Sequence, residues 1–248
     1  MYKLDKETKN CIKEAKNIFE KEMINVKYLL NEIGQNKEKN SIDKIFGANV
    51  FAVGSEMLVL EILENLERSH LLISIIGLRS LFENYINVHY IYNHPDHLKD
   101  NNWAIKICED FIERTKNPRA MKSKTGGKSL FKRAKELNLE DLYTMVYSEL
   151  CNYSHFLADV TDIIYPFYFK GKTIETCIYT ITFYQDTLIA ISTFYGTSFD
   201  IFIDDILLFK KKGEKILSSI DAKKEYLKFI YLNGKVLKFK YSFLYIFS

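Results

Sequence analysis

Two segments of the sequence carry side chains that could perform acid–base or phosphate chemistry. Residues 77–92 contain Arg79 and Glu83, and residues 143–156 contain Tyr147 and His155. Histidine titrates near neutrality and can act as an acid or a base, while arginine can stabilise negative charge on a phosphate. If the two segments pack together, His155 could take a proton from a ribose 2′-hydroxyl. Arg79 would then stabilise the phosphate, and Glu83 would orient one of the two.

Each of these residues also has a structural interpretation. Arg79 and Glu83 stand four positions apart, so on a helix they could form a surface ion pair contributing roughly 0.3–0.5 kcal/mol. Apolar neighbours such as Leu78 and Phe82 indicate a partly buried pair instead. Buried charges need partners, which they find either in a structural network or in a site. A single histidine on a helix face, such as His155, is more often structural than catalytic.

Other motifs do not fit a cofactor or a metal. TGGKS at 125–129 lacks the upstream glycine of a phosphate-binding loop and follows a polar stretch rather than a strand. His94 and His97 flank a proline, with no third ligand nearby. The four cysteines form no CxxC pair, which favours a reducing compartment over a disulfide framework. We therefore predict no metal and no cofactor.

Length and charge set broader limits. The chain has 248 residues with a net charge of +3, which suits one large domain and is too weak by itself to indicate nucleic-acid binding. Its first residues have no apolar core of a secretory signal, and its apolar stretches carry polar interruptions. These features predict a cytoplasmic protein with no membrane span. RNA, a partner protein or a second copy in a homodimer are the partners we consider.

The elements that position the candidate residues are predicted to be helices. Only three prolines and ten glycines interrupt the chain, and apolar residues recur every three or four positions. Ser55 and Ser69 are candidate N-caps, glycines 47 and 54 indicate a loop, and Pro166 marks a connection. The predicted helices cover residues 5–38, 56–67, 70–92, 96–116, 129–137, 139–160 and 173–195, with a surface loop over 117–129.

The C-terminal region has a different pattern. Residues 199–220 are ambiguous and most consistent with a helix, whereas 226–232 and 235–241 flank Asn233 and Gly234. An Asn-Gly pair between apolar runs is a strong hairpin signal. We predict a mainly α fold, a multi-helix bundle over residues 1–198, followed by an appendage over 199–248 with a helix and a small β hairpin.

The sequence resembles an uncharacterised bacterial family of helical proteins known only as a domain of unknown function. The resemblance rests on RSLFE at 79–83, SLFKRAKEL at 129–137 leading into Tyr143 and Tyr147, and LCNYSH at 150–155, and it covers residues 55–195. It implies a helical bundle. The recurrent polar positions that it implies are Arg79, Glu83, Tyr147, Ser154 and His155.

A more distant similarity is to the HEPN class, metal-independent helical-bundle ribonucleases of phage defence and toxin systems. Those enzymes place a histidine a few residues after an arginine. Here His89 lies too far from Arg79, and His70 too close to Arg68, so the motif is absent. Two functions stay open: an RNA-cleaving or RNA-binding protein of phage defence or a toxin system, and a non-catalytic protein–protein interaction module with a buried Arg, Glu, Tyr and His network.

Overall fold

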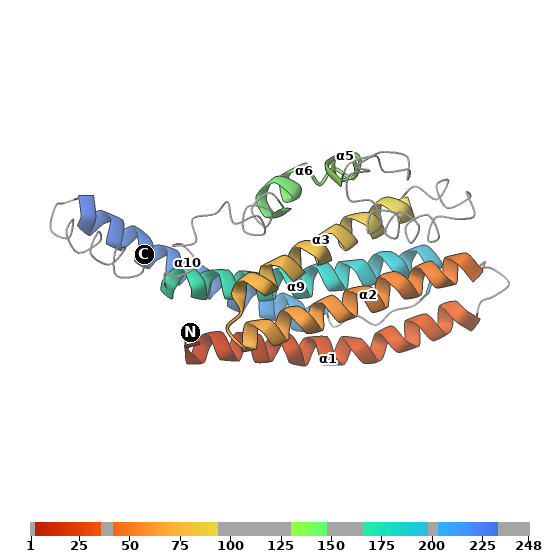
Figure 1. The fold of residues 1–248 in the computed structure, drawn as a ribbon, viewed down its shortest axis with the longest axis horizontal. Coiled ribbons are helices and arrows are strands. Elements are labelled where there is room, and N and C mark those ends of the chain that lie inside the picture. Colours follow the sequence, from red (N-terminus) through yellow and green to blue (C-terminus); the bar gives the residue numbers. More distant parts are fainter. Residues whose placement is uncertain (1–2, 36–41, 94–129, 148–165, 198–202, 233–248) are drawn as a thin grey trace, which may run out of the picture.

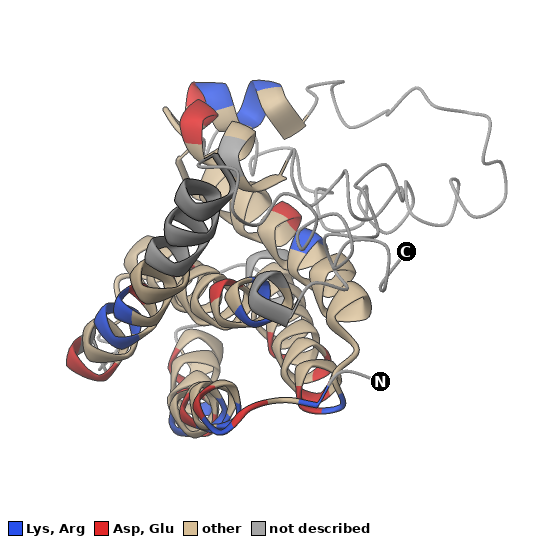
Figure 2. Cartoon of the chain, turned by 90° about the vertical axis from the view of Figure 1, so that its left-hand side faces the viewer, with Lys and Arg blue, Asp and Glu red and all other residues tan. Residues whose placement is uncertain are grey.

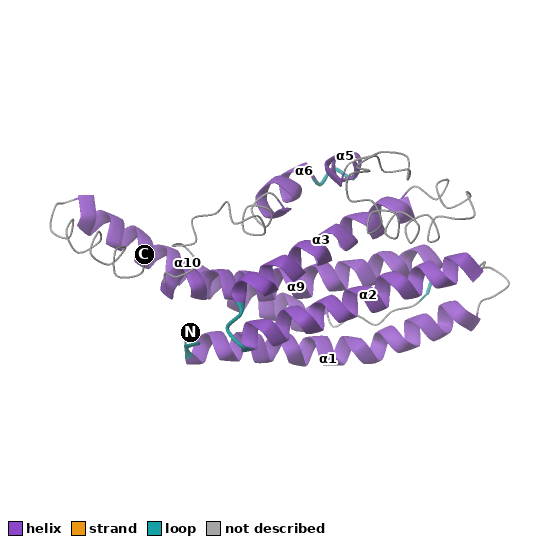
Figure 3. Ribbon diagram, in the orientation of Figure 1, coloured by secondary structure: helices purple, strands orange, loops and turns teal. Residues whose placement is uncertain are grey.

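The structure, a computed structural model, describes most of the chain and is mainly helical, with short turns and no strand among the described residues (Figure 3). The predicted helix over 96–116, the loop over 117–129 and the segment 148–160 lie outside the described residues. The described ranges are 3–35, 42–93, 130–147, 166–197 and 203–232.

Four long helices lie side by side and form the body of the molecule (Figure 1). They are α1 (Lys6–Gln35), α2 (Ile42–Glu67), α3 (Leu71–Asn93) and α9 (Pro166–Tyr195). Helix α2 runs opposite to the other three, which are parallel to one another (Figure 1). The prediction of a helical bundle is confirmed for the described residues.

The core lies between the facing sides of these helices. Seen from one end, the long helices surround a common centre, and most of each ribbon is uncharged (Figure 2). Phe82 and Tyr184 are almost completely buried, and Phe19 meets Tyr184 edge to face with ring centroids 5.4 Å apart. Such aromatic pairs add about 0.5–1.5 kcal/mol beyond their burial.

Helix α1 follows its predicted span closely. Its buried residues, such as Ile12, Phe19 and Val26, recur every three or four positions and face the core. Near its start, Lys170 of α9 pairs with Asp5 and Glu7, with Nζ–O distances of 2.8 and 2.5 Å. Burial alone would raise the pKa of Asp5, but its hydrogen bonds with Lys170 and Thr8 lower it below its usual value. This pairing brings the first turns of two parallel helices together.

The loop predicted around glycines 47 and 54 is wrong, because both lie inside α2. Ala48, Ala52 and Val59 continue the buried face through this region, so tertiary packing outweighs the glycine cost of about 1 kcal/mol each. Ser55 is therefore not an N-cap. It is buried within α2 and accepts a 2.6 Å hydrogen bond from the Asn84 side chain of α3.

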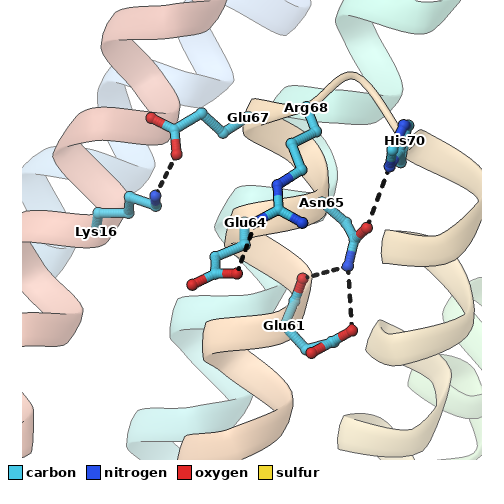
Figure 4. Close-up of polar contacts among 7 residues, drawn as sticks. All are labelled: Lys16, Glu61, Glu64, Asn65, Glu67, Arg68 and His70. Atoms are coloured by element: carbon cyan, nitrogen blue, oxygen red, sulfur yellow. Dashed lines mark hydrogen bonds and ion pairs between the residues drawn. The ribbon is translucent and has the colours of Figure 1, made fainter.

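Ser69 ends α2 rather than capping α3. Its φ of 63° is left-handed, and the amide of His70 donates to the carbonyl of Asn65 at 2.8 Å. This is the Schellman arrangement that closes a helix C-terminus. Around the same turn, Lys16 of α1 pairs with Glu67 and the Asn65 side chain contacts Glu61 and His70 (Figure 4). Residues 56–67 and 71–92 thus belong to two separate helices joined by this turn, as predicted.

Helix α9 begins at Pro166, earlier than the predicted start at 173, so the predicted connection at Pro166 is wrong. Proline suits the first position of a helix, where its missing N–H is not needed. Helix α9 contains many threonines, a residue type that is common in strands. Their hydroxyls instead donate to carbonyls four residues earlier, as Thr173 does to Phe169 and Thr180 to Thr176, both at 2.7 Å.

Helix α10 (Ile203–Leu232) packs antiparallel to α1 and α9, and its later part extends beyond the bundle (Figure 1). Its residues Ile206 and Phe209 belong to the same core as the four long helices. The first predicted hairpin strand, 226–232, is the end of this helix, so that prediction is wrong. Residues 235–241 lie outside the described residues. Asn233 and Gly234 also lie outside the described residues.

Three short elements lie across α3 on the side away from α1 (Figure 1). They are α5 (Leu130–Glu136), α6 (Glu140–Leu142) and the π-helical turn η2 (Tyr143–Tyr147). The short predicted helix over 129–137 is confirmed by α5. Asn138 joins α5 to α6 with a left-handed φ of 57°, a conformation that asparagine tolerates.

Of the described helices, α3 has the length and apolar composition of a membrane-spanning segment. Half of that apolar stretch is buried inside the bundle. This burial is typical of a core helix.

Candidate functional site

A line of polar side chains runs along one side of α3 and faces α5 and η2. Its members on α3 are Arg79, Glu83, Asn87 and Tyr90, spaced by three or four residues, so they share one side of the helix. Each of them contacts a side chain of the segment that lies across α3. We call this line of contacts the α3 seam.

Three of the four predicted site residues meet in the α3 seam. The Tyr147 hydroxyl donates to Glu83 Oε1 at 2.7 Å and accepts from the Arg79 guanidinium at 3.3 Å. Arg79 Nε also donates to the same Glu83 oxygen at 3.2 Å. These three contacts form a closed triangle. Two of its members, Glu83 and Tyr147, are 64 residues apart in the sequence.

Aromatic contacts hold the Tyr147 ring in place. The ring stacks on Phe82 with centroids 5.8 Å apart, and Phe82 is fully buried in the core. The Arg79 guanidinium carbon lies 5.3 Å from the centroid of the same ring, a distance suited to a cation–π contact. The ring of Tyr143, one turn earlier, packs against that of Tyr147, with ring centroids 4.8 Å apart.

The triangle is partly open to solvent. The Arg79 side chain is 26% exposed and that of Glu83 is 40% exposed. A sealed core network would exclude water from both groups, whereas a deep catalytic cleft would offer one face to a ligand. Chemically, the three groups can neutralise charge and fix geometry, because the guanidinium, carboxylate and hydroxyl are directed at one another.

Sequence reasoning missed the rest of the α3 seam. Arg133 of α5 donates to the Asn87 side chain, and the Tyr90 hydroxyl donates to Glu136 Oε2 at 2.9 Å. The positions of Asn87 and Tyr90 relative to Arg79 were a usable signal, since both continue its helical face. Their partners lie in the stretch 129–137 that the family resemblance had already singled out.

A second polar cluster lies between α3 and α9, and the sequence did not indicate it. The rings of Tyr85 and His89 are 4.6 Å apart, and His89 hydrogen-bonds to the Asp186 backbone. Burial lowers the pKa of His89 below its usual 6.5, although that hydrogen bond opposes the shift. Burial also raises the pKa of Asp186, against the attraction of Lys210. The imidazole is therefore neutral at pH 7.

Two cysteine thiols, those of Cys11 in α1 and Cys177 in α9, are also buried. A hydrogen bond with Cys11, together with burial, raises the pKa of Cys177 well above its usual range. Since the thiolate is the nucleophilic form, Cys177 is a packing residue and not a nucleophile at neutral pH.

His155, the fourth predicted site residue, lies outside the described residues, as does Ser154. Within the described part of the chain, no group of three or more His, Cys, Asp or Glu side chains could hold a metal ion. No family model, no curated protein and no solved structure matches this chain. The resemblances drawn from the sequence therefore stay predictions.

Proposed function

We propose that the protein is a non-catalytic helical interaction module, in which the α3 seam fixes α5 and η2 on the bundle. The observation that carries this proposal is the Tyr147 hydroxyl, which both donates to Glu83 and accepts from Arg79. Because this hydroxyl both donates and accepts a hydrogen bond within the protein, structural partners occupy it.

The pattern of contacts along α3 supports the same function. A catalytic centre concentrates its polar groups at one point, whereas the seam spreads them over three turns of α3 and pairs each with α5 or η2. Polar networks whose members are all paired make helix packing specific, because any shift in register would leave buried groups without partners.

Removing one hydroxyl tests the structural role. Tyr147→Phe keeps the ring contact with Phe82 but removes the link between helices, so we expect a loss of about 1 kcal/mol in the free energy of unfolding. Tyr28→Phe is the matched control, since Tyr28 is 70% exposed on α1. Urea denaturation of both variants measures the difference. Equal stability of Tyr147→Phe and the control would contradict the role of the seam.

Metal-independent RNA cleavage in phage defence or a toxin system is the second candidate. It is favoured by the partial exposure of Arg79 and Glu83, which lets a phosphate approach the guanidinium. In this function His155 is the general base and Arg79 stabilises the phosphate.

The two candidates predict opposite results with purified protein and single-stranded RNA. An interaction module leaves the RNA intact. If the wild type degrades the RNA, and His155→Ala and Arg79→Gln abolish this while their melting temperatures stay within a few degrees of the wild type, the protein is a ribonuclease. RNA that survives incubation with the wild type eliminates that candidate.

A further inference from the structure

We propose that a hydroperoxide joins Cys11 of α1 and Cys177 of α9 in a disulfide, so that oxidation locks the first helix of the bundle to the last of its four long helices. Both cysteines are free thiols in this structure. They lie on two helices that take no part in the α3 seam, so the proposed disulfide goes beyond the structural role of the seam.

The register of α1 against α9 brings the two cysteines to the same level. Seven residues before Cys177, Lys170 pairs with two carboxylates at the start of α1. Seven residues after Cys177, Tyr184 meets Phe19 edge to face. Seven residues are close to two helical turns, so both contacts lie on the side of α9 that carries Cys177. On α1, Cys11 stands between the same two contacts and therefore faces Cys177.

Small side chains flank the cysteines on both helices. On α1, Thr8 and Ala15 stand three residues before and four residues after the cysteine, and both are completely buried. On α9, Thr173 and Thr180 stand four before and three after, and they are buried as fully. The distance between packed helices depends on the size of the side chains at the contact, so small ones let α1 and α9 approach closely. A disulfide needs this proximity, because it joins Cα atoms about 4.4–6.8 Å apart.

The two thiols are already in contact in the reduced protein. A hydrogen bond joins the side chains of Cys11 and Cys177, and both belong to the main core cluster. Cys177 is completely buried, whereas Cys11 is 6% exposed, so a small oxidant reaches Cys11 first. The second thiol is then held beside the oxidised one.

The reaction balances with hydrogen peroxide as the oxidant. The Cys11 thiolate attacks one peroxide oxygen, the O–O bond breaks, and the departing hydroxide takes up a proton to give water and a sulfenic acid. The Cys177 sulfur then attacks the Cys11 sulfur. The S–O bond breaks as the S–S bond forms, and the hydroxyl leaves with the Cys177 proton as a second water. Each sulfur loses one electron, and the peroxide gains two.

The second step should depend on pH. Burial and the hydrogen bond with Cys11 keep Cys177 protonated at pH 7 in the resting protein, because they raise its pKa. The attacking form is the thiolate, so disulfide formation should be slow at neutral pH and faster in alkaline solution.

The first test maps the disulfide directly. The full-length protein is reduced, freed of reductant, exposed to hydrogen peroxide without denaturant, alkylated and digested. Trypsin cleaves after lysine and arginine, so Cys11 lies in peptide 10–13 and Cys177 in peptide 173–210. Mass spectrometry should find the two peptides joined after peroxide treatment and separate after dithiothreitol. The rate of joining should rise as the pH is raised above 7.

Thermal unfolding gives a second readout. The two cysteines are separated by 165 residues, and a crosslink that closes so long a loop restricts the unfolded chain strongly. Peroxide should therefore raise the melting temperature of the wild type by roughly 10 °C, and dithiothreitol should reverse the change. Cys11→Ala should show no such rise. Cys108→Ala combined with Cys151→Ala is the matched control, because it keeps the proposed pair and should respond as the wild type does.

Several results would overturn the inference. These are free Cys11 and Cys177 in the peroxide-treated wild type, joined peptides that appear only when the protein is oxidised in denaturant, and an equal rise in melting temperature for Cys11→Ala. Oxidation of Cys11 to a sulfinic acid while Cys177 stays free would show that the two sulfurs are not held within bonding distance.

Discussion

At the scale of single residues, His89 links the stability of the fold to pH. Its Nε2 atom is buried without a hydrogen-bond partner among the described residues, and burial lowers its pKa below 6.5. The unfolded chain, whose imidazole titrates near 6.5, therefore binds more protons than the folded one just below that pH. Stability contributed by neutral His89 is complete above pH 6.5 and is lost as the pH falls toward its folded pKa.

We expect His89→Gln to flatten this dependence. Glutamine has no proton to gain in this range, so the free energy of unfolding should change less between pH 7.5 and 5.5 than in the wild type. Asp186 shifts in the opposite direction but is present in both proteins, so it largely cancels in the comparison. Urea denaturation at a series of pH values measures the difference. Parallel curves for the two proteins would show that His89 does not carry the effect.

Local spacing was enough to predict some contacts of the candidate site and not others. Arg79 and Glu83 are four residues apart on one helix, so their pairing follows from helical geometry. Tyr147 reaches them from a distant segment, and its neighbours alone do not specify which helix it meets. The partly buried environment was visible in the apolar residues around Arg79, whereas the pairing of Asn87 with Arg133 required the packing of α5.

At the scale of the helices, Gly54 and Gly77 have different surroundings, so substitution by alanine should change stability in opposite directions. A Cβ at Gly54 would meet no atom within 4 Å, whereas a Cβ at Gly77 would lie 2.7 Å from Ile62 Cγ1. Gly54→Ala should therefore raise stability by roughly 0.5–1 kcal/mol, through helix propensity. Gly77→Ala should lower it, because the Ile62 side chain or the two helices would have to move to make room for the added methyl group.

Thermal unfolding measures the stability of both variants. Each variant is the control for the other, because both replace a helical glycine with alanine. A loss of stability in Gly54→Ala would mean that the backbone near residue 54 is not helical in solution. A gain in Gly77→Ala would mean that the Ile62 side chain of α2 does not pack against Gly77 in solution.

The errors at this scale have a common cause. Glycines 47 and 54 and Pro166 are residues that interrupt helices in isolation, and each was interpreted as a break or a connection. In the folded chain, Ala48, Ala52 and Val59 bury one side of α2 so extensively that two glycines do not end it. Pro166 occupies the first position of α9, where proline does no harm.

At the scale of the whole molecule, α10 and the four long helices share one core. Phe209 of α10 is 2% exposed and belongs to the cluster that also contains Phe82 and Tyr184. Phe209→Ala should therefore lower the stability of the whole bundle by about 3–5 kcal/mol. We expect the variant to unfold in one transition at a lower temperature, as measured by calorimetry.

An independently folded C-terminal region would give a different result. If residues 199–248 fold as an independent appendage, Phe209→Ala will leave the main transition unchanged and move or remove a separate, smaller one. Leu208→Ala, at the exposed neighbouring position, should shift neither transition by more than a degree or two.

The helical class and most helices of the described chain could be predicted, because apolar periodicity and the scarcity of breakers are local properties. The parallel arrangement of α1, α3 and α9 could not, since it depends on which helices meet after the long stretch between α3 and α9. The contacts of Lys170 with Asp5 and Glu7, and of Tyr92 with Phe194, record that arrangement at the two ends of the bundle.

This parallel arrangement has a consequence for the newly made chain. Helix α9 contacts α1, α2 and α3, yet 72 residues separate the end of α3 from its start. While the ribosome synthesises that stretch, the apolar sides of the first three helices have no α9 to cover them. At about 5–20 residues per second this interval lasts several seconds, during which the nascent chain is open to chaperone binding or aggregation.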